Sequence, residues 1–180
     1  IVPDISNPFF AEIAKGVEGA ANKYNYNVFL CNTDDQHEKE IGYVDVLAEN
    51  RVEGIIITSN YIPSTQQLAM LKALEVPIVF IDRQFGQKQV SGVFLDNVKG
   101  GYLATKHLIE LGHRNICCIT GPLISKSDKD RLQGYINALK EHNIILNKKL
   151  IVKGDYKLDS GYTEGIKKIT EGVRAFFASN

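Results

Sequence analysis

The chain has 180 residues, of which 44% are hydrophobic and 23% are charged, and its 21 basic and 21 acidic side chains cancel. This composition is ordinary for a soluble protein that buries a sizeable core, in one large domain or two small ones. The balanced charge excludes a global field that would attract nucleic acid or an anionic membrane, so we do not expect this segment to contact DNA itself.

The three cysteines, Cys31, Cys117 and Cys118, form neither an even set nor a C-x-x-C pair. All three lie in apolar runs, where cysteine usually serves as a small buried hydrophobic residue. This usage favours a reducing, cytoplasmic location over a secreted one. No signal peptide and no apolar run of about 18 residues is present, so no membrane-spanning segment is predicted. Because the chain does not begin with Met and stops abruptly at Asn180, we expect a fragment truncated at both ends.

Strand-like and helical patterns alternate through the first half of the chain. Ile1-Val2 is the end of a strand, and a helix over Pro8–Tyr24 follows, because Asn7 can cap it and proline suits its first position. Apolar residues at three- and four-residue steps predict that this helix buries one stripe. The elements expected after it are a strand at 28–31, a helix with Ile41, Val44, Leu47 and Ala48 inward, a strand at 54–58, a helix opened by Pro63 and a strand at 78–81.

The alternation breaks after Asp82, where no helical pattern follows and the next strand is expected at 90–95. Asp96 or Asn97 then caps a helix, and Gly112 ends it. The later elements expected are a strand at 115–120, a helix at 127–142, a strand at 150–152, a helix at 159–169 and a strand at 175–178.

The expected strands are continuous apolar runs rather than alternating ones, which is typical of a sheet covered on both faces. Helices regularly follow these strands, so the pattern predicts the α/β class, with parallel sheets and right-handed β-α-β connections. Two such series are separated by the irregular segment after Asp82. We therefore expect two similar lobes, residues 1–95 and residues 96–180, with the boundary near Leu95/Asp96.

Polar and aromatic side chains gather after the expected strands. In open parallel sheets, ligands bind beyond the carboxyl ends of the strands. Sugars suit this mixture, because aromatic rings stack on their apolar faces while carboxylates, amides and guanidinium groups bond their hydroxyls. The positions that this rule selects are Ser6, Asn7, Phe9 and Phe10, then 59–61, then Asp82 and Arg83, then 125–131 including Arg131, then Asp155 and Tyr156, and finally Ser179 and Asn180.

The strongest of these candidates also have a purely structural interpretation. Capping alone explains Asn7, and one of Phe9 and Phe10 belongs to the core, since Phe10 falls in phase with the helix stripe. The corresponding interpretations of the others are a surface ion pair of little energetic value for Asp82 and Arg83, an exposed, solvated side chain for Arg131, and an isolated loop aromatic for Tyr156.

Motifs of catalysis and of cofactor binding are absent from the sequence. The run that begins at Gly121 lacks the glycine–lysine spacing of a P-loop, no G-x-G-x-x-G follows a strand, and no G-x-S-x-G elbow is present. The four histidines, His37, His107, His113 and His142, lack metal-ligand spacing. We therefore expect no enzyme, no cofactor and no metal site.

A series of motifs runs through essentially the whole chain. They are Asp4-Ile5-Ser6-Asn7-Pro8-Phe9-Phe10, Val76-Pro77-Ile78-Val79-Phe80-Ile81-Asp82-Arg83, Asp96-Asn97-x-x-Gly100-Gly101, His107-Leu108-Ile109-x-Leu111-Gly112-His113-Arg114, Gly121-Pro122 with Arg131-Leu132-x-Gly134-Tyr135, Gly154-Asp155-Tyr156 with Ser160-Gly161-Tyr162, and Phe177-Ala178-Ser179-Asn180. In order and spacing this set resembles the effector-binding core of the lac/gal-type bacterial transcriptional repressors. The set is far more specific than any single motif.

The resemblance implies a type I periplasmic-binding-protein-like fold, in which a small effector binds between two Rossmann-like lobes with parallel sheets. It also implies homodimerisation through the core lobes and an N-terminal helix-turn-helix, absent from this chain, that binds operator DNA. The motifs further resemble pentose-binding proteins, so a ribose-like sugar is the expected effector, while phosphate-bearing effectors, purines or a protein corepressor stay open. The ligand contacts carried over by position are Asn7, Phe9, Phe10, Asp82, Arg83, Arg131 and Tyr156.

The chain also departs from the family pattern. The aspartate that usually follows the final asparagine would lie beyond Asn180, and the segment between Gly161 and Ala175 is slightly short. An extracytoplasmic sugar-binding receptor of a transporter is the alternative function, since it would share the fold and the chemistry. The free cysteines and the Leu111–Arg114 stretch favour the regulator. A nucleotide-dependent enzyme is the third hypothesis, and no residue set supports it.

Overall fold

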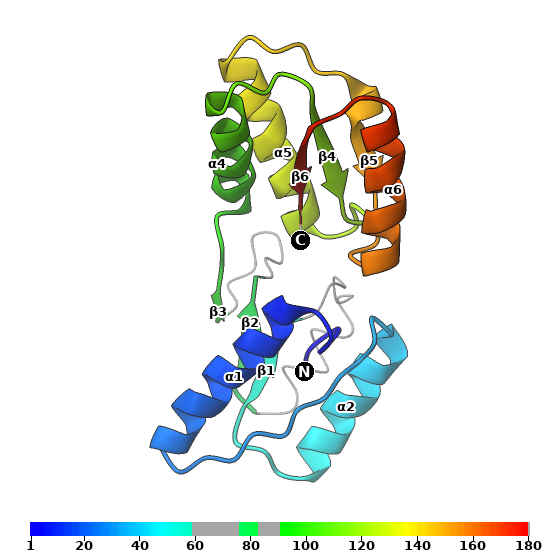
Figure 1. The fold of residues 1–180 in the computed structure, drawn as a ribbon. Helices are drawn as coiled ribbons and strands as arrows, with labels where there is room; N and C mark the ends of the chain where they lie inside the picture. Colours follow the sequence, from blue (N-terminus) through cyan, green and yellow to red (C-terminus); the bar gives the residue numbers. More distant parts are fainter. Residues whose placement is uncertain (59–75, 83–90, 180) are drawn as a thin grey trace. The chain divides into compact units, whose positions relative to one another are not determined.

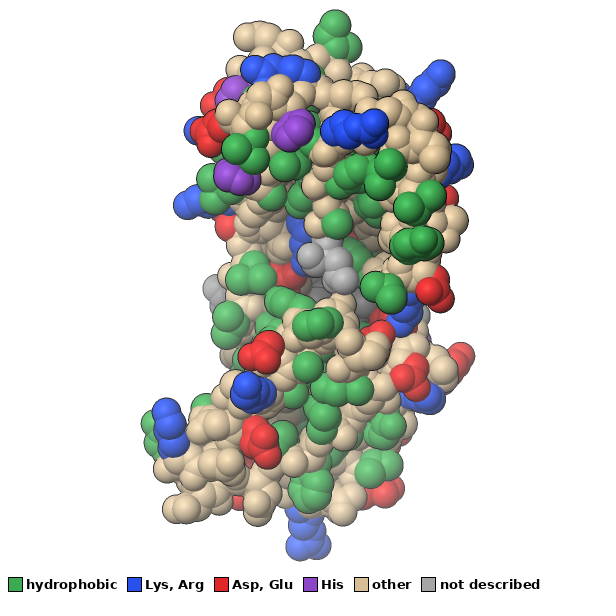
Figure 2. All heavy atoms as spheres, viewed as in Figure 1, with side chains coloured by type: hydrophobic (Ala, Val, Ile, Leu, Met, Phe, Trp, Pro, Cys, Tyr) green, Lys and Arg blue, Asp and Glu red, His purple; other side chains and the backbone are tan. Residues whose placement is uncertain are grey.

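The computed structural model describes residues 1–58, 76–82 and 91–179. The chain divides into two compact units, Ile1–Phe94 and Leu95–Asn180. Figure 2 shows acidic and basic side chains interspersed on the visible face of each unit, as expected for a chain whose charges cancel.

The first unit contains a three-stranded parallel sheet in the order β1-β2-β3 (Figure 1). The strands are β1 (Ile55–Ile57), β2 (Ile78–Ile81) and β3 (Gly92–Val93), and the helices are α1 (Pro8–Lys23) and α2 (His37–Glu49). Ile1 and Val2 extend this parallel arrangement, because the backbone of Ile1 bonds to Ile56 and Thr58 while Val2 forms a parallel bridge with Asn32. The continuous apolar strands predicted at 54–58 and 78–81 are therefore confirmed.

The core of the first unit is formed by the sheet and by one face of α2. Its buried residues are Ile1, Cys31, Val44, Leu47, Ile55, Ile57 and Phe80. Two predictions for this unit were wrong. Helix α1 carries its apolar stripe but buries none of it fully, and the run 28–31 forms no strand, with Phe29 68% exposed. An apolar run shows that burial is possible, but it does not identify the surface that supplies it.

The second unit contains the parallel sheet β5-β4-β6, in which β4 lies at the centre. Figure 1 shows α4 and α5 together beside this sheet, with α6 on its other side. The strands are β4 (Ile116–Thr120), β5 (Ile151–Lys153) and β6 (Ala175–Ala178), and the helices are α4 (Asn97–Glu110), α5 (Lys126–Glu141), α6 (Leu158–Thr170) and the short 3₁₀ helix η1 (Lys148–Leu150). The strands and helices predicted after residue 96 are confirmed to within one or two residues at each end.

Helices α4 and α5 pack in unusually close contact because each presents a glycine to the other. A Cβ on Gly101 would collide with the backbone of Arg131, and a Cβ on Gly134 would collide with the carbonyl oxygen of Val98. Below this contact the Tyr135 hydroxyl donates a hydrogen bond to the carbonyl of Ile116, 2.9 Å away. The glycines thus fix where the middle of α5, around Arg131 and Gly134, lies against the first turns of α4.

The helix predicted from Pro63 lies outside the described residues, as does most of the loop after Asp82. The strand expected at 90–95 is shorter in the structure, because only Gly92 and Val93 pair with β2. Both residues of this short strand are exposed.

Candidate functional site

The turn between Val2 and α1 presents two aromatic rings. Asn7 caps the helix, since its side-chain oxygen accepts a hydrogen bond from the backbone N–H of Phe9 at 3.0 Å, and Pro8 occupies the first helical position. The Phe9 ring is 39% exposed and meets the half-buried Phe10 ring edge-to-face, with centroids 5.1 Å apart. Phe9 is therefore the ring presented to solvent, whereas Phe10 supports it.

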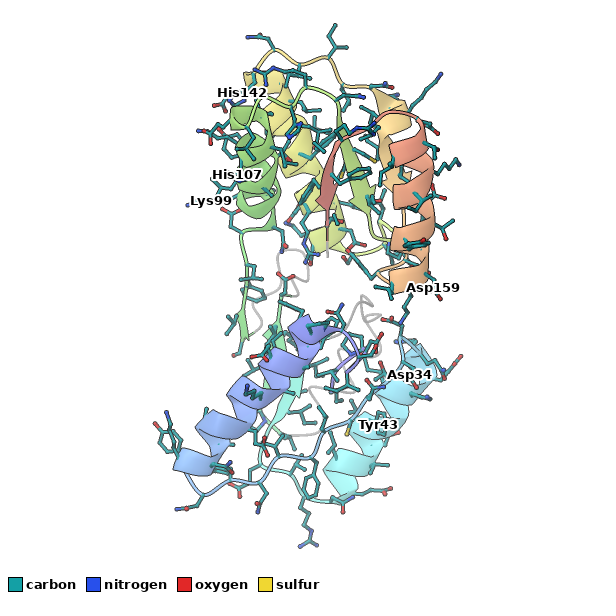
Figure 3. All side chains as sticks on the ribbon, viewed as in Figure 1. Asp34, Tyr43, Lys99, His107, His142 and Asp159 are labelled. Carbon is teal, nitrogen blue, oxygen red and sulfur yellow. The ribbon has the colours of Figure 1, made fainter. Side chains whose placement is uncertain are left out.

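A polar network holds this turn. The Ser6 hydroxyl donates to the carboxylate of Asp4 at 2.6 Å, and the side-chain oxygen of Asn32 accepts a hydrogen bond from the backbone N–H of Ile5 at 2.8 Å. Asp34, labelled in Figure 3, accepts from Asn32 and pairs with Lys39. The Lys39 ammonium, and to a lesser extent the Asn32 amide, hold the pKa of Asp34 below its usual value.

Asp82 lies directly at the carboxyl end of β2. Its backbone has a φ of 53°, in the left-handed region that non-glycine residues seldom adopt, and its N–H donates to the carbonyl of Val93 at 2.8 Å. Because Val2, β1 and β2 run in parallel, Asp82 and the Asn7 turn follow the same edge of the sheet. Arg83 lies outside the described residues.

In the second unit, Arg131 is anchored rather than solvated. Its Nε donates to the side-chain oxygen of Asn97 at 2.7 Å, and its Nη1 donates to the carbonyl of Ser179 at 2.6 Å. The arginine thereby links the start of α4, the first turns of α5 and the residue that follows β6. The interpretation of Arg131 as an exposed surface side chain was wrong.

Tyr156 is also held in place. It lies in the loop after β5 with a φ of 66°, and its hydroxyl donates to the carboxylate of Asp128. Its ring occupies the space above Gly121, where any Cβ would collide with it. Burial first, and then the neighbouring Asp128 carboxylate, raise the pKa of the Tyr156 hydroxyl. The interpretation of Tyr156 as an isolated loop aromatic was therefore wrong.

Asp128 was not singled out from the sequence, although it lies at the centre of this arrangement and is only 4% exposed. It is the third residue of α5 and forms a capping box, in which its backbone N–H donates to the Ser125 hydroxyl and its carboxylate accepts the N–H of Ser125. The pattern Ser125-x-x-Asp128 before an amphipathic run is a recognisable signal for such a box. That signal predicts the cap but not the bond to Tyr156.

One more polar atom in this cluster is notable. The Ser179 hydroxyl is buried and lies within hydrogen-bonding reach of the Tyr156 hydroxyl. This cluster brings a cation, an aromatic ring, an anion and a buried hydroxyl to the carboxyl ends of β4, β5 and β6, namely those of Arg131, Tyr156, Asp128 and Ser179.

Two of the histidines lie in or next to helices of the second unit. Figure 3 labels His107 on α4 and His142 just after α5, and a ring nitrogen of His142 lies 2.9 Å from the carbonyl oxygen of Ala138. Within the described part of the chain, no three His, Cys, Asp or Glu side chains are placed to hold a metal ion. No helix in the same residues is both long and apolar enough to cross a bilayer.

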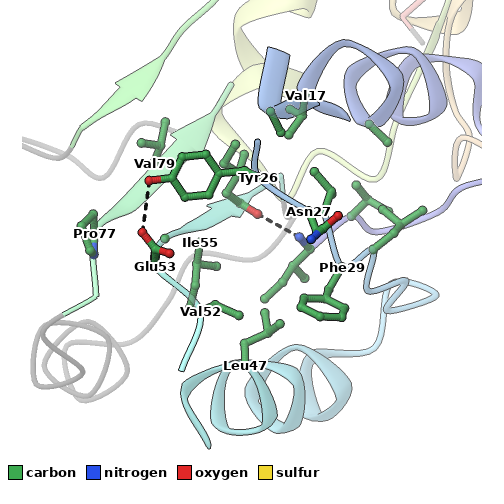
Figure 4. Close-up of a pocket in the computed structure, with 18 of the residues that line it drawn as sticks. Val17, Tyr26, Asn27, Phe29, Leu47, Val52, Glu53, Ile55, Pro77 and Val79 are labelled. Carbon is green, nitrogen blue, oxygen red and sulfur yellow. Dashed lines mark hydrogen bonds between the residues drawn. The ribbon is translucent and has the colours of Figure 1, made fainter. Parts of the chain in front are cut away.

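A hollow of about 580 Å³ lies in the first unit under α1 (Figure 4). Its walls include Val17 of α1, Phe29 and Leu47, and at one end the Tyr26 hydroxyl donates to Glu53 at 3.1 Å. Several lining residues, among them Glu53 and Pro77, come just before β1 and β2. None of the site residues predicted from the sequence lines this hollow.

Residues 1–163 match the family described as periplasmic binding proteins and the sugar binding domain of the LacI family. The chain belongs to this family. Among curated members of the LacI family, the transcriptional regulator DegA of Bacillus subtilis is 35% identical over 184 residues, which cover 100% of this chain and 54% of the regulator. The ribose operon repressor of Halalkalibacterium halodurans is 34% identical over 182 residues, covering 100% of this chain and 53% of the repressor.

A solved LacI-family structure shares the fold. The periplasmic binding protein/LacI transcriptional regulator of Alkaliphilus metalliredigens, complexed with D-xylulofuranose, superposes with a TM-score of 0.78 and 28% identity, over 98% of this chain and 64% of that one. The type I periplasmic-binding-protein-like fold expected from the sequence is therefore confirmed. The chain spans about half the length of the curated regulators that it matches, and these relatives are transcription regulators rather than enzymes.

Proposed function

We propose that this chain is the effector-binding and dimerisation part of a sugar-responsive transcriptional regulator, which modulates operator binding by a domain outside these 180 residues. The observation that carries the proposal is the cluster in the second unit, where Arg131 and Tyr156 are held in place beside the buried Ser179 hydroxyl. A buried hydroxyl, a fixed guanidinium group and an aromatic ring are the groups that a polyhydroxylated ligand requires.

In each unit, the proposed effector contacts follow the strands of that unit's own sheet. In the first unit Phe9 provides a stacking surface, and Asn7 and Asp82 provide hydrogen-bonding groups at the carboxyl edge of the sheet. The full proposed set is Asn7, Phe9, Phe10, Asp82, Arg83, Arg131 and Tyr156. Phe10 has the weakest claim, since it is half-buried behind Phe9.

The proposed effector is a neutral pentose. Support comes from two relatives: the ribose operon repressor, and the regulator solved with D-xylulofuranose. The partners proposed for the whole protein are a second copy of the chain and operator DNA, the latter through a helix-turn-helix in the part not represented here. The proposed location is the cytoplasm, where the three free, buried cysteines would stay reduced. No catalysis, cofactor or membrane contact is part of the proposal.

A thermal-shift panel on the full-length protein tests the function. The panel contains D-ribose, D-xylulose, D-xylose, their phosphates and a set of purines. One neutral pentose is expected to raise the melting temperature in a concentration-dependent manner, because a ligand that binds only the folded state stabilises it by mass action. Stabilisation by a purine alone, or by none of these compounds, would contradict the proposal.

The alternative, an extracytoplasmic receptor of a transporter, has the same fold and ligand chemistry. It is favoured by one observation, namely that the matching family includes periplasmic binding proteins. Sequencing the gene upstream of Ile1 separates the two functions. A helix-turn-helix domain is expected there for a regulator, and a signal peptide for a receptor.

A further inference from the structure

We propose that Asp128 determines the effector class of this protein, by holding Tyr156 in its binding position and by placing a negative charge that excludes phosphorylated effectors. The inference rests on the proposed function, since it concerns the same site. Asp128 contributes to specificity indirectly, because it lies behind the side chains that face the ligand.

The first part of the argument is geometric. Tyr156 has a left-handed backbone conformation, which costs free energy for a residue with a bulky side chain, so something must hold it there. Asp128 is the partner that does so, because its carboxylate accepts the hydroxyl of Tyr156. Gly121 supplies the space under the ring, where a Cβ would collide. Asp128 and Gly121 together thus determine the position of the Tyr156 ring.

The second part is electrostatic. Asp128 and Arg131 lie three residues apart on α5, so they share one side of the helix, and Tyr156 is close enough to both for their opposite charges to act on its hydroxyl. An isolated arginine beside a helix start would attract a phosphate. Here the buried Asp128 carboxylate opposes that attraction. The site therefore presents a nearly neutral environment, which suits hydroxyl groups better than a phosphate.

Asp128 also has a structural role, because it completes the capping box of α5 with Ser125. The Asp128→Asn variant removes the charge and keeps the shape, since its one oxygen can accept the N–H of Ser125 while its amide NH2 can donate to the Tyr156 hydroxyl. The matched control is Asp130→Asn, which removes the same charge from the same helix at a residue that pairs with Lys126 instead. A general effect of charge on α5 would appear in both variants, whereas a specificity effect would appear only at Asp128.

The test uses calorimetric titration of the full-length protein with inorganic phosphate, D-ribose and D-ribose 5-phosphate. In the Asp128→Asn variant the affinity for phosphate should rise by roughly tenfold or more over wild type, since two charges a few ångströms apart in a partly buried site interact strongly. The ratio of ribose to ribose 5-phosphate affinity should fall by a similar factor. Asp130→Asn should leave both quantities unchanged.

Two results would overturn the inference. One is an Asp128→Asn variant that folds normally and binds phosphate no better than wild type. The other needs no variant: wild-type protein that binds ribose 5-phosphate more tightly than ribose. If no sugar binds at all, the proposed function fails, while the comparison of phosphate affinities still decides whether Asp128 excludes anions.

Discussion

The hydroxyl of Tyr156 donates a hydrogen bond to the carboxylate of Asp128, across 28 positions of the chain. The bond connects the loop after β5 with the first turn of α5, two segments that follow neighbouring strands of one parallel sheet. An aromatic residue in the family motif Gly154-Asp155-Tyr156 is thus part of a network that includes the helix cap. The stability of the second unit and the shape of its candidate site consequently depend on the same contact.

Replacing Tyr156 with Phe should destabilise the protein. The change leaves the ring but removes the donor to a buried carboxylate, and such a loss costs about 1–3 kcal/mol of unfolding free energy. Urea denaturation followed by circular dichroism measures the change. The matched control is Tyr162→Phe, because the Tyr162 side chain is 71% exposed on α6. Equal effects of the two changes would show that the Tyr156 hydroxyl has no special role.

Replacing Gly134 with Ala should also destabilise the second unit. The added Cβ would collide with the backbone of α4, which must move away, and overpacking of this kind costs about 1–3 kcal/mol. Because the displacement shifts α5 relative to α4, the bond between Arg131 and Asn97 should weaken too. The readouts are the unfolding free energy and the affinity for the stabilising pentose.

The control for this change is Gly100→Ala, on the exposed side of α4, where a new Cβ meets nothing. Alanine favours a helix over glycine by about 1 kcal/mol, so this variant should be slightly more stable than wild type. The opposite signs expected for Gly134→Ala and Gly100→Ala distinguish helix contact from helix propensity. If Gly134→Ala were as stable as wild type, the close approach of the helices would not be required.

The second half of the chain was predictable because its signals are local. Asp96 caps α4 through the N–H of Lys99, as its position before an amphipathic run indicates, and the apolar run at 116–119 forms β4. The Asn7-Pro8 start of α1 was predictable for the same reason. Caps and continuous apolar strands depend on a few neighbouring residues, so the sequence contains the information that specifies them.

The first half was less predictable because its outcome depends on distant contacts. The apolar residues Val28, Phe29 and Leu30 suggest a strand, but pairing requires a partner edge, which periodicity does not identify. The stripe of α1 likewise predicts a buried face, whereas in the structure it borders a hollow. In both cases the pattern indicated the tendency of the segment, and tertiary packing decided the result.

The candidate site was likewise predictable only in part, where its features depend on the local sequence. The rule of strand ends selected Arg131 and Tyr156 correctly as residues at the carboxyl edge of the sheet. It did not reveal that Asp128 bonds to Tyr156, because the contact requires a positive φ at Tyr156 and open space above Gly121. Neither the backbone conformation of Tyr156 nor the space above Gly121 can be deduced from the residue types alone.

The buried thiol of Cys118 should make stability fall in alkaline solution. Burial raises its pKa to about 12, above the value of about 8.5 expected in the unfolded chain. The unfolded state therefore loses its proton first as the pH rises, so the contribution to stability is complete below about pH 8.5 and declines between there and about pH 12. Cys118→Ala should consequently destabilise the protein at pH 7, but by less at pH 10.

The measurement for Cys118 is urea denaturation of wild type and variant at both pH values under reducing conditions. Comparing the two proteins at each pH cancels the contributions of other groups, such as lysines. If Cys118→Ala destabilises the protein equally at pH 7 and pH 10, thiol ionisation in the unfolded state does not affect the folding equilibrium. The reaction of the thiol with an alkylating agent should also be slow until denaturant is added, because Cys118 is fully buried.

Replacing Asp82 with Ala should weaken binding of the stabilising pentose more than tenfold, since hydrogen bonds from hydroxyls to a charged group contribute about 1.5–3 kcal/mol each. Asp82 is suited to this role because it ends β2 at the sheet edge with its backbone fixed by Val93. The control is Asp45→Ala, which removes an exposed carboxylate from α2 of the same unit. Calorimetric titration of the full-length protein gives the affinities, and circular dichroism checks that both variants are folded. An Asp82→Ala variant that is folded and binds the pentose as tightly as Asp45→Ala does would remove Asp82 from the site, and would leave the other proposed contacts as the determinants of recognition.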